Sequence, residues 1–337
     1  MSQKTAQEIR LKQRPVGMPG PADFELATVS VNEPGAGEVQ VRNLWMSVDP
    51  YMRGRMVDRR SYVPPFQVGE VLQGGAVGEV VESNDDNFAP GDHVLSMNGW
   101  REWYVAPAKG LTKVDGQAAP LQAYLGALGM PGMTAYAGLL RIGEPKDGET
   151  VFVSAASGAV GAIVCQIAKL KGCRVVASVG SERKAAWLGD DLGIDAVINY
   201  KSCGNLMRAL RAIAPDGVDV YFENVGGEHL RAALDAMNPF GRIVMCGMIS
   251  GYNDTEPRPG PPNLFNMIGK NLRMQGFIVT QLWDMYPDFV KDMSAWIAAG
   301  EIRWQETVAT GIENAPNAFM QLFTGDNFGK MLVKLGA

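Results

Sequence analysis

Residues 153–161 read VSAASGAVG and lie between the apolar run TVFV and the helix-like run AIVCQIAKLKG. A small-residue turn that joins a strand to a helix lets backbone N–H groups at the helix N-terminus approach a pyrophosphate. Gly158 and Gly161 occupy the last two glycine positions of the dinucleotide-binding pattern GxGxxG, whereas the first position carries Ala156. The pattern alone also fits a tight turn with close helix packing, so the flanking sequence has to decide between the two interpretations.

The flanking sequence alternates between apolar and amphipathic segments. Near-continuous Val/Ile runs separated by helices indicate a parallel sheet that is covered on both faces. The expected strands are TVFVSAA, CRVVASV, AVINY, VDVYFENV and GRIVMCGMI, and the expected helices are AVGAIVCQIAKLKG, SERKAAWLGDDLG, NLMRALRAIAP and GEHLRAALDAM. This alternation predicts an α/β fold with a doubly wound parallel sheet of the Rossmann type.

The remaining sequence has a different character. Residues 8–125 are rich in Gly and Pro and contain short alternating segments such as EVQVRNLWMSV, which predicts a β-rich domain with irregular connections. The segment GALGMPGMTAYAGLL predicts a linking helix, and the tail returns to a strand, helix, strand pattern. We therefore expect a β-rich domain over 1–127, a Rossmann domain over 128–302, and a segment over 303–337 that returns to the first domain.

Charged residues follow the next expected strand, about 20 residues after the glycine turn, where NAD-binding units carry an acid for the ribose hydroxyls. Here the sequence is Ser181-Glu182-Arg183-Lys184. Cations at this point suit a 2′-phosphate, because a hydrogen bond to a charged group contributes roughly 1.5–3 kcal/mol. The alternative is a capped helix start with solvated charges, and Glu182 counts against a phosphate site. Together with the turn, the cations favour NADP over NAD.

Composition excludes several classes of function. The net charge is −5 with scattered basic residues, which argues against a nucleic-acid surface or a polybasic membrane anchor. The four cysteines have no metal-ligand spacing and the two histidines are isolated, so no metal site is expected. The start of the chain lacks the apolar core of a signal peptide, and no apolar run reaches the length of a membrane span. We expect a cytoplasmic protein that acts on small molecules.

Several blocks in order resemble one family. They are MSVDPYMRGRM, LGMPGMTAY, AASGAVG, AKLKGCRVV, FENVGG, CGMISGYN, QGFIV, GIENAPNAF and NFGK, and they extend over nearly the whole chain. The chain resembles the zinc-independent medium-chain dehydrogenase/reductases, in the branch of leukotriene B4 12-hydroxydehydrogenase/prostaglandin reductase and the alkenal double-bond reductases, with bacterial NADPH-dependent curcumin reductase nearest. Zinc-binding relatives have a GHE motif where this chain has Val68-Gly69-Glu70, which lacks the histidine.

The resemblance implies a GroES-like β-rich domain completed by the C-terminal segment, a Rossmann domain, NADPH between them, and a homodimer formed through QGFIVTQ at the sheet edge. It implies that the pyrophosphate binds at the turn, the 2′-phosphate at Lys184 and Tyr200, and the ribose near Asn224. The turn residues are Gly158, Ala159, Val160 and Gly161. The residues implied for the nicotinamide half are Cys246, Gly247, Met248, Ile249, Ser250, Tyr252, Phe277, Ile278, Val279 and Asn327. Tyr200 and Phe277 could instead be core aromatics, and Asn224 a turn residue.

Reduction of an activated C=C bond requires a hydride at the β carbon, stabilisation of the enolate oxygen and a proton for the α carbon. We expect Tyr252 to donate a hydrogen bond to the carbonyl or to supply the proton, with a ribose hydroxyl or water as alternative proton sources. A phenol can donate while it stays mostly neutral, but Tyr252 could also be a surface loop residue. In the β-rich domain, Tyr51 is the second catalytic candidate and Tyr62 is a substrate-pocket candidate. Met248, in the Rossmann domain, is the other substrate-pocket candidate.

The predicted function is NADPH-dependent reduction of α,β-unsaturated ketones or aldehydes, including large conjugated ones such as curcumin. A zinc-free quinone oxidoreductase would share the same scaffold. An NADPH-binding sensor without turnover is the alternative from another class.

Overall fold

The computed structural model describes residues 4–336, and the chain divides into two compact units. Unit 1 takes its described residues from Met1–Gly126, Glu306–Asn327 and Met331–Ala337, and unit 2 comprises Ala127–Gln305 and Phe328–Lys330. Within residues 4–336, no helix is both long enough and apolar enough to cross a membrane.

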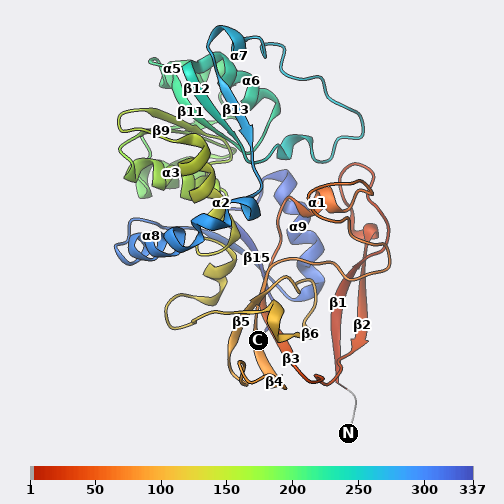
Figure 1. Cartoon of the computed structure of the whole chain (residues 1–337). Coiled ribbons are helices and arrows are strands. Elements are labelled where there is room, and N and C mark those ends of the chain that lie inside the picture. Colours follow the sequence, from red (N-terminus) through yellow and green to blue (C-terminus); the bar gives the residue numbers. More distant parts are fainter. Residues whose placement is uncertain (1–3, 337) are drawn as a thin grey trace. The chain divides into compact units, whose positions relative to one another are not determined.

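Unit 2 contains one six-stranded parallel sheet with the order β10-β9-β8-β11-β12-β13 (Figure 1). Counted along the chain this is the order 3-2-1-4-5-6, which characterises dinucleotide-binding sheets whose ligand lies where the strand order reverses. Here the reversal falls between β8 and β11. The strands are β8 (Thr150–Val153), β9 (Arg174–Val179), β10 (Ala196–Asn199), β11 (Val218–Glu223), β12 (Met237–Met245) and β13 (Arg273–Gly276). The predicted α/β class with a doubly wound parallel sheet is confirmed.

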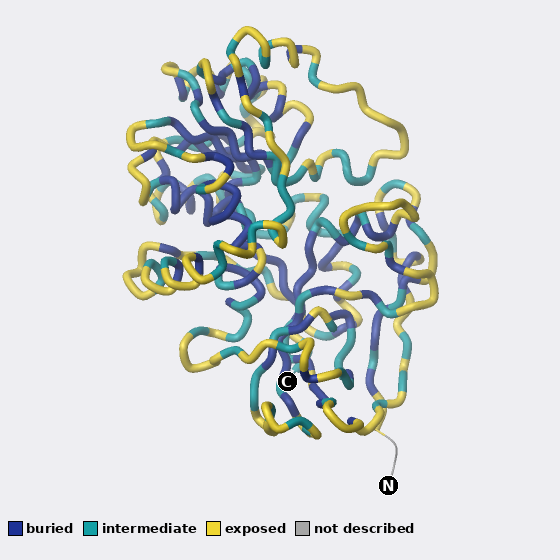
Figure 2. The backbone as a smooth tube through the Cα atoms, in the orientation of Figure 1, coloured by how far each residue is buried: buried dark blue, intermediate teal, exposed yellow. Residues whose placement is uncertain are grey.

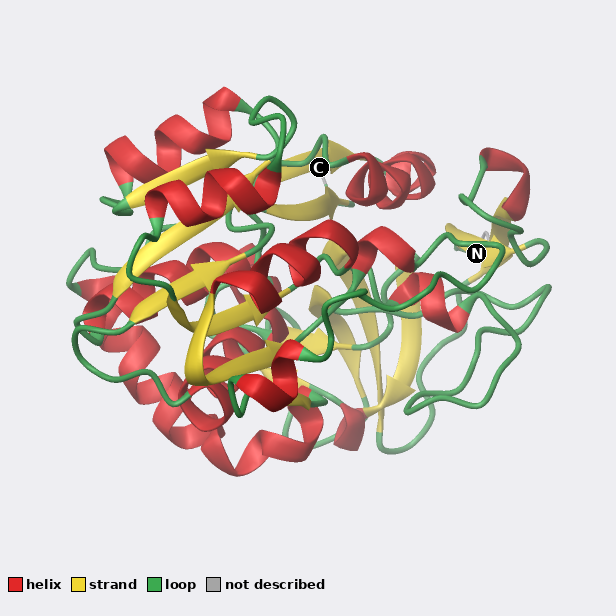
Figure 3. Cartoon of the chain, turned by 90° about the horizontal axis from the view of Figure 1, so that it is seen from above, coloured by secondary structure: helices red, strands yellow, loops and turns green. Residues whose placement is uncertain are grey.

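Helices cover both faces of this sheet (Figure 3). Alternate strand residues point to opposite faces, so Val151 and Val153 pack under α3 and Phe152 packs under α5 and α6. The strands therefore lie among the most buried parts of the unit (Figure 2). The helical segments are α2 (Met130–Ala137), η4 (Gly138–Gly143), α3 (Gly161–Leu170), α4 (Glu182–Ala186), η5 (Trp187–Asp191), α5 (Leu206–Ile213), α6 (Gly227–Ala236), η6 (Ile249–Gly251), α7 (Asn266–Gly269), η7 (Val279–Met285) and α8 (Tyr286–Ala298).

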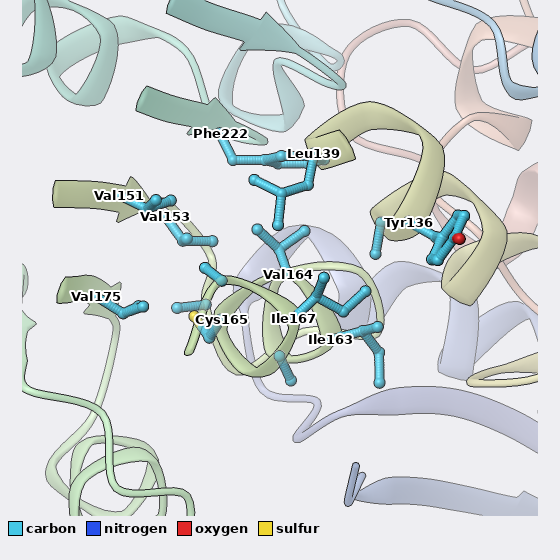
Figure 4. Close-up of a cluster of buried hydrophobic side chains, with 14 of the residues drawn as sticks. Tyr136, Leu139, Val151, Val153, Ile163, Val164, Cys165, Ile167, Val175 and Phe222 are labelled. Atoms are coloured by element: carbon cyan, nitrogen blue, oxygen red, sulfur yellow. The ribbon is translucent and has the colours of Figure 1, made fainter. Parts of the chain in front are cut away.

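Helix α3 packs directly against the first strand and ends at a glycine. Ile163, Val164 and Ile167 of α3 pack in the cluster that contains Val151 and Val153 of β8 (Figure 4). The end of α3 is a Schellman motif, in which the Cys173 amide bonds to the Ala168 carbonyl and the Gly172 amide bonds to Lys169, with Gly172 at φ +77°. The helix is thus fixed at its packed face and at its C-terminus, and its N-terminus begins at the glycine turn.

Unit 1 contains a seven-stranded sheet with the order β14-β15-β3-β4-β5-β7, and β6 pairs with β3. A separate hairpin is formed by β1 and β2. The unit's largest aromatic cluster joins Trp100, Phe24 and Phe319, the last from the C-terminal helix α9. The elements are β1 (Thr5–Leu11), η1 (Pro21–Asp23), β2 (Phe24–Ser30), β3 (Glu38–Ser47), α1 (Met52–Arg55), β4 (Ala76–Ser83), β5 (His93–Ser96), β6 (Trp103–Pro107), η2 (Ala108–Gly110), β7 (Thr112–Lys113), η3 (Leu121–Leu125), β14 (Glu306–Thr310), η8 (Ile312–Asn314), α9 (Ala315–Thr324) and β15 (Lys330–Lys334).

The start of α3 leaves no space for a side chain at Gly161, and this predicts a stability effect. A Cβ at Gly161 would lie 2.4 Å from the Ala155 carbonyl oxygen. We expect Gly161→Ala to lower the free energy of unfolding by about 1–3 kcal/mol through overpacking, measured by urea denaturation. The matched control is Gly189→Ala in η5, where a Cβ meets nothing within 4 Å. That variant should be unchanged or slightly more stable, and equal effects of the two substitutions would contradict the packing argument.

Candidate functional site

The turn between β8 and α3 presents amide groups toward the carboxyl end of the sheet. No side chain caps α3 at Val160. Among residues 4–336, the amides of Ala159, Val160 and Gly161 donate no hydrogen bond to the protein. Unsatisfied N–H groups at the start of a ten-residue helix provide the donors and the positive dipole end that bind phosphate. The residues present therefore fit a dinucleotide pyrophosphate.

The turn itself is built from close backbone approaches. Ala155 adopts φ +47°, the left-handed region that alanine rarely occupies. This brings its carbonyl oxygen 3.0 Å from the Gly158 amide and to the position that a Cβ of Gly161 would need. The glycines at 158 and 161 thus permit the tight turn and the close helix packing together, so the packing interpretation and the phosphate interpretation describe the same geometry.

The ends of β8 and β11 are tied together where the strand order reverses. The Asn224 side-chain nitrogen donates to the Ser154 carbonyl at 2.7 Å, and the Asn224 amide donates to the Ser154 hydroxyl at 2.9 Å. Asn224 was expected near the cofactor ribose, and its side-chain nitrogen is engaged with the protein. The structure thus gives Asn224 a clear role in positioning the two strand ends.

Glu223 is a buried carboxyl beneath this junction that the sequence analysis did not select. Its Oε1 accepts hydrogen bonds from the Ser154 hydroxyl at 3.0 Å, from the Val225 amide at 2.6 Å and from the Gly226 amide at 2.8 Å. Burial raises the pKa of Glu223, and the bonds from Gly226 and Val225 oppose that shift. The carboxyl holds the FENVGG turn in shape, which a pattern of turn-forming residues gave no reason to expect.

The loop after β12 lies beside this junction. The amides of Cys246 and Gly247 both donate to the Glu223 carbonyl at 3.0 Å, and the Ile249 amide donates to the Asn224 carbonyl at 3.2 Å. Burial, with Glu223 adding to it, raises the pKa of the Cys246 thiol to about 12. A thiol with such a pKa stays protonated at neutral pH and is a poor nucleophile.

Tyr252 folds back over the same loop. The Met248 amide donates to the Tyr252 hydroxyl oxygen at 3.2 Å, and a Cβ at Gly247 would lie 3.1 Å from that oxygen. Tyr252 therefore lies beside the carboxyl ends of β11 and β12 and accepts a main-chain hydrogen bond. An amide directed at the phenol oxygen stabilises negative charge on it.

The carboxyl ends of β9 and β10 bring the expected 2′-phosphate residues together. Ser181 caps α4 by accepting from the Lys184 amide at 3.4 Å. Tyr200 directly follows β10, and its hydroxyl lies 2.9 Å from the position of a Cβ on Gly180, so glycine allows the close approach. Glu182, which counted against a phosphate site, accepts hydrogen bonds from Asn199 at 2.5 Å and Ser202 at 3.2 Å.

Tyr200 is supported by a buried histidine. The His229 ring meets Tyr200 edge to face at 5.1 Å, and its Nε2 lies 2.8 Å from the Ser178 hydroxyl. Burial lowers the pKa of His229 to about 4, so it is neutral at physiological pH. An isolated histidine in a helical segment gave no sequence signal for this packing role.

The segment that follows β13 supplies Phe277, Ile278 and Val279, all of them half-buried. Phe277 and Val279 pack against the core cluster of α2 and α3, and a Cβ at Gly138 would meet the Phe277 ring at 2.6 Å. Strand β13 is the last strand of the sheet order, so its outer edge has no strand partner in the described chain. The contact of Phe277 with the core cluster agrees with its alternative assignment as a core aromatic residue.

Tyr51 and Tyr62 lie in unit 1, and both interact electrostatically with Arg55. Tyr51 immediately precedes α1, and Tyr62 is exposed. Burial, followed by the charge of Asp49, raises the pKa of Tyr51, while Arg55 opposes the shift. Arg55 itself donates to the Pro64 carbonyl at 2.9 Å and lies over the Phe66 ring. Tyr51 is thus a neutral hydroxyl at physiological pH.

Two further expectations concern Asn327 and metal ligands. Asn327 is the last residue of its segment in unit 1, directly before Phe328 of unit 2. Over residues 4–336, no three His, Cys, Asp or Glu side chains are grouped in a way that could hold a metal ion.

A 3-2-1-4-5-6 parallel sheet with donor amides where its order reverses defines a dinucleotide-binding protein. A model described as the N-terminal domain of oxidoreductase matches residues 7–114, and one described as zinc-binding dehydrogenase matches residues 159–296. The 2-alkenal reductase (NADP(+)-dependent) of Nicotiana tabacum is 46% identical over 331 residues, which covers 97% of this chain and 96% of that protein. The NADPH-dependent curcumin reductase of Escherichia coli (strain K12) is 42% identical over 330 residues, which covers 96% of this chain and 95% of that protein.

A solved structure agrees with these relatives. CurA from Vibrio vulnificus in complex with NADPH has a TM-score of 0.94 and 41% identity, covering 98% of this chain and 100% of that one. The chain belongs to the medium-chain dehydrogenase/reductase family, and the resemblance seen in its sequence blocks is confirmed.

The buried carboxyl predicts a pH dependence of stability. Because the pKa of Glu223 in the folded protein lies above its ordinary value of 4.5, the native state retains a proton that the unfolded chain releases. Stability attributable to Glu223 should therefore fall as pH rises above that value. We expect the unfolding free energy of the wild type, minus that of Glu223→Gln, to decrease between about pH 5 and about pH 8 in urea denaturation. The glutamine keeps the Oε1 acceptor, and a difference independent of pH would show that the carboxyl is not shifted.

Proposed function

We propose that this chain reduces the C=C bond of α,β-unsaturated ketones and aldehydes with NADPH. The observation that carries the proposal is the 42–46% identity over nearly the full length to NADPH-dependent curcumin and 2-alkenal reductases. It is supported by amides at 159–161 that suit a pyrophosphate and by cations at Arg183 and Lys184 that suit a 2′-phosphate. NADPH, when bound, supplies the hydride that the β carbon accepts.

The protein binds and orients the cofactor and the substrate, and it assists protonation of the substrate. We assign the pyrophosphate to Gly158, Ala159, Val160 and Gly161, and the 2′-phosphate to Lys184 and Tyr200. Asn224 is assigned to the cofactor ribose. The residues assigned to the nicotinamide half are Cys246, Gly247, Met248, Ile249, Ser250, Tyr252, Phe277, Ile278, Val279 and Asn327. Tyr62 and Met248 are assigned to the substrate pocket, and Tyr51 is assigned as a second hydroxyl donor.

Tyr252 is the proposed donor to the substrate carbonyl. As the β carbon accepts hydride, negative charge develops on the carbonyl oxygen, and a donor placed there stabilises the enolate. The Met248 amide that donates to the Tyr252 oxygen strengthens the phenol as a donor, because it stabilises the charge that remains when the proton moves toward the substrate. The proton for the α carbon comes from Tyr252, a ribose hydroxyl or water.

Tyr252→Phe tests this assignment. We expect kcat with an enone to fall about 100-fold or more, as for loss of a general acid, while the Kd for NADPH changes less than about two-fold. Tyr124→Phe is the control, because that hydroxyl lies in unit 1 and donates to the Asp115 carbonyl. Unchanged turnover in Tyr252→Phe would refute the donor role, and absence of enone-dependent NADPH oxidation in the wild type would favour a sensor without turnover. A quinone oxidoreductase would instead oxidise NADPH faster with quinones than with enones.

Lys184→Ala tests the cofactor choice. Loss of a charge-assisted hydrogen bond should raise the Kd for NADPH by roughly ten-fold or more while the Kd for NADH stays the same. Both values follow from titration of the cofactor's fluorescence. An equal affinity of the wild type for the two cofactors would contradict the phosphate assignment.

We also propose a homodimer, zinc-independent turnover and a cytoplasmic location. The dimer is supported by β13, whose outer edge has backbone donors and acceptors available to a second copy. Zinc independence is supported by two potential zinc ligands. The His229 ring contacts the Ser178 hydroxyl and the Tyr200 ring, and burial keeps the Cys246 thiol protonated. Sedimentation equilibrium at monomer mass would refute the dimer, and loss of turnover in a chelator would refute zinc independence.

A further inference from the structure

The tripeptide Phe328–Gly329–Lys330 belongs to unit 2, although the tail segments before it (Glu306–Asn327) and after it (Met331–Ala337) belong to unit 1. Its backbone is fixed on two sides. The Gly329 amide donates to the Ser157 carbonyl at 3.0 Å, and the Lys330 amide donates to the Gln305 carbonyl at 2.8 Å. Gly329 also forms an isolated parallel bridge with Gly158 of the glycine turn. The tripeptide is therefore attached to the turn assigned to the pyrophosphate.

Only glycine fits at the centre of the tripeptide. Gly329 has φ +72°, and a Cβ there would lie 1.8 Å from the Gln305 carbonyl oxygen. This narrow passage fixes where the preceding side chain begins. The Phe328 ring lies against the segment that follows β9.

The Phe328 ring lies between two residues of that segment. It meets the Trp187 ring edge to face, with centroids 5.1 Å apart and planes at 83°. The Arg183 guanidinium carbon lies 5.2 Å from the Phe328 centroid, within the range of a cation–π interaction. Trp187 is buried, so it gives the phenylalanine a rigid support, whereas Arg183 is exposed.

Within residues 4–336, no acidic side chain neutralises the Arg183 charge. Among the described residues Arg183 makes no ion pair with an acid. Its neighbour Glu182 is bonded to Asn199 and Ser202 instead. An arginine held by an aromatic face keeps its five N–H donors available to an anion, and its planar fork matches phosphate oxygens.

The two contacts of the tripeptide lie at the ends of adjacent parallel strands, β8 and β9, where a Rossmann sheet binds the adenosine ribose and its 2′ substituent. We propose that Phe328 is a positioning residue for cofactor selectivity, which holds the Arg183 guanidinium toward the 2′-phosphate of NADPH while Gly329 ties it to the pyrophosphate turn. This deepens the proposed function and rests on NADPH binding at this site. A residue of the C-terminal tail thus contributes to the choice between NADPH and NADH without contacting the cofactor.

The test is a double-mutant cycle on cofactor affinity, measured by fluorescence titration without substrate. Phe328→Leu keeps an apolar side chain against Trp187 but removes the aromatic face. We expect it to raise the Kd for NADPH about two- to five-fold, the effect of one exposed cation–π contact, and to leave the Kd for NADH unchanged. Thermal unfolding of each variant confirms that the fold is intact.

The second part of the experiment identifies the residue through which Phe328 affects NADPH binding. In an Arg183→Ala background, Phe328→Leu should have no further effect on the Kd for NADPH, because the cation it positions is gone. In a Lys184→Ala background its effect should persist, because Arg183, the cation over the ring, is still present. Three results would overturn the proposal. They are a higher Kd for both NADPH and NADH in Phe328→Leu, an unchanged Kd for NADPH in that variant, or an effect of Phe328→Leu that persists in the Arg183→Ala background. Failure of the wild type to bind NADPH is a separate result, which would overturn the proposed function itself.

Discussion

The contact between the start of α3 and the turn after β8 is the constraint on which the rest of unit 2 depends. A Cβ at Gly161 has no room, because the Ala155 carbonyl oxygen already occupies that place. The close approach lets α3 pack on β8 through Ile163, Val164 and Ile167 while its first amides stay directed at the carboxyl edge of the sheet. Packing and phosphate recognition therefore follow from one missing side chain, and no capping residue is needed at the helix start.

A second layer of buried polar contacts fixes the opposite side of the site. Ser154, Glu223 and Asn224 join the ends of β8 and β11, and the loop that carries Tyr252 bonds to the same strand end through Cys246 and Gly247. In a buried network each group depends on the others, since a polar atom left without a partner costs roughly 1–3 kcal/mol. The proposed donor thus rests on a preorganised loop, which is the condition for stabilising a developing oxyanion.

Sequence patterns predicted the strands β8 to β12, because each contains a short apolar run and the connections between them are amphipathic. They predicted the position of the turn for the same reason, together with its two glycines. They did not predict the edge strand β13, because its residues RMQG contain no apolar run. They could not predict the left-handed Ala155, because alanine gives no signal for φ +47°. They also missed Glu223, whose neighbours Asn224, Val225 and Gly226 resemble an ordinary turn, and Phe328, whose partners Arg183 and Trp187 lie more than 140 positions earlier in the chain. Long-range contacts of this kind leave no local periodicity.

The placement of the C-terminal strand has a consequence for biosynthesis. Strand β15 pairs with β3, and Phe319 of α9 completes the aromatic cluster with Trp100 and Phe24. On the ribosome, unit 1 begins to emerge first but lacks these elements until residues 306–334 are synthesised, whereas unit 2 is complete in all but three residues before then. The usual N-to-C order of co-translational folding is therefore reversed, and one edge of β3 stays unpaired until β15 has been synthesised.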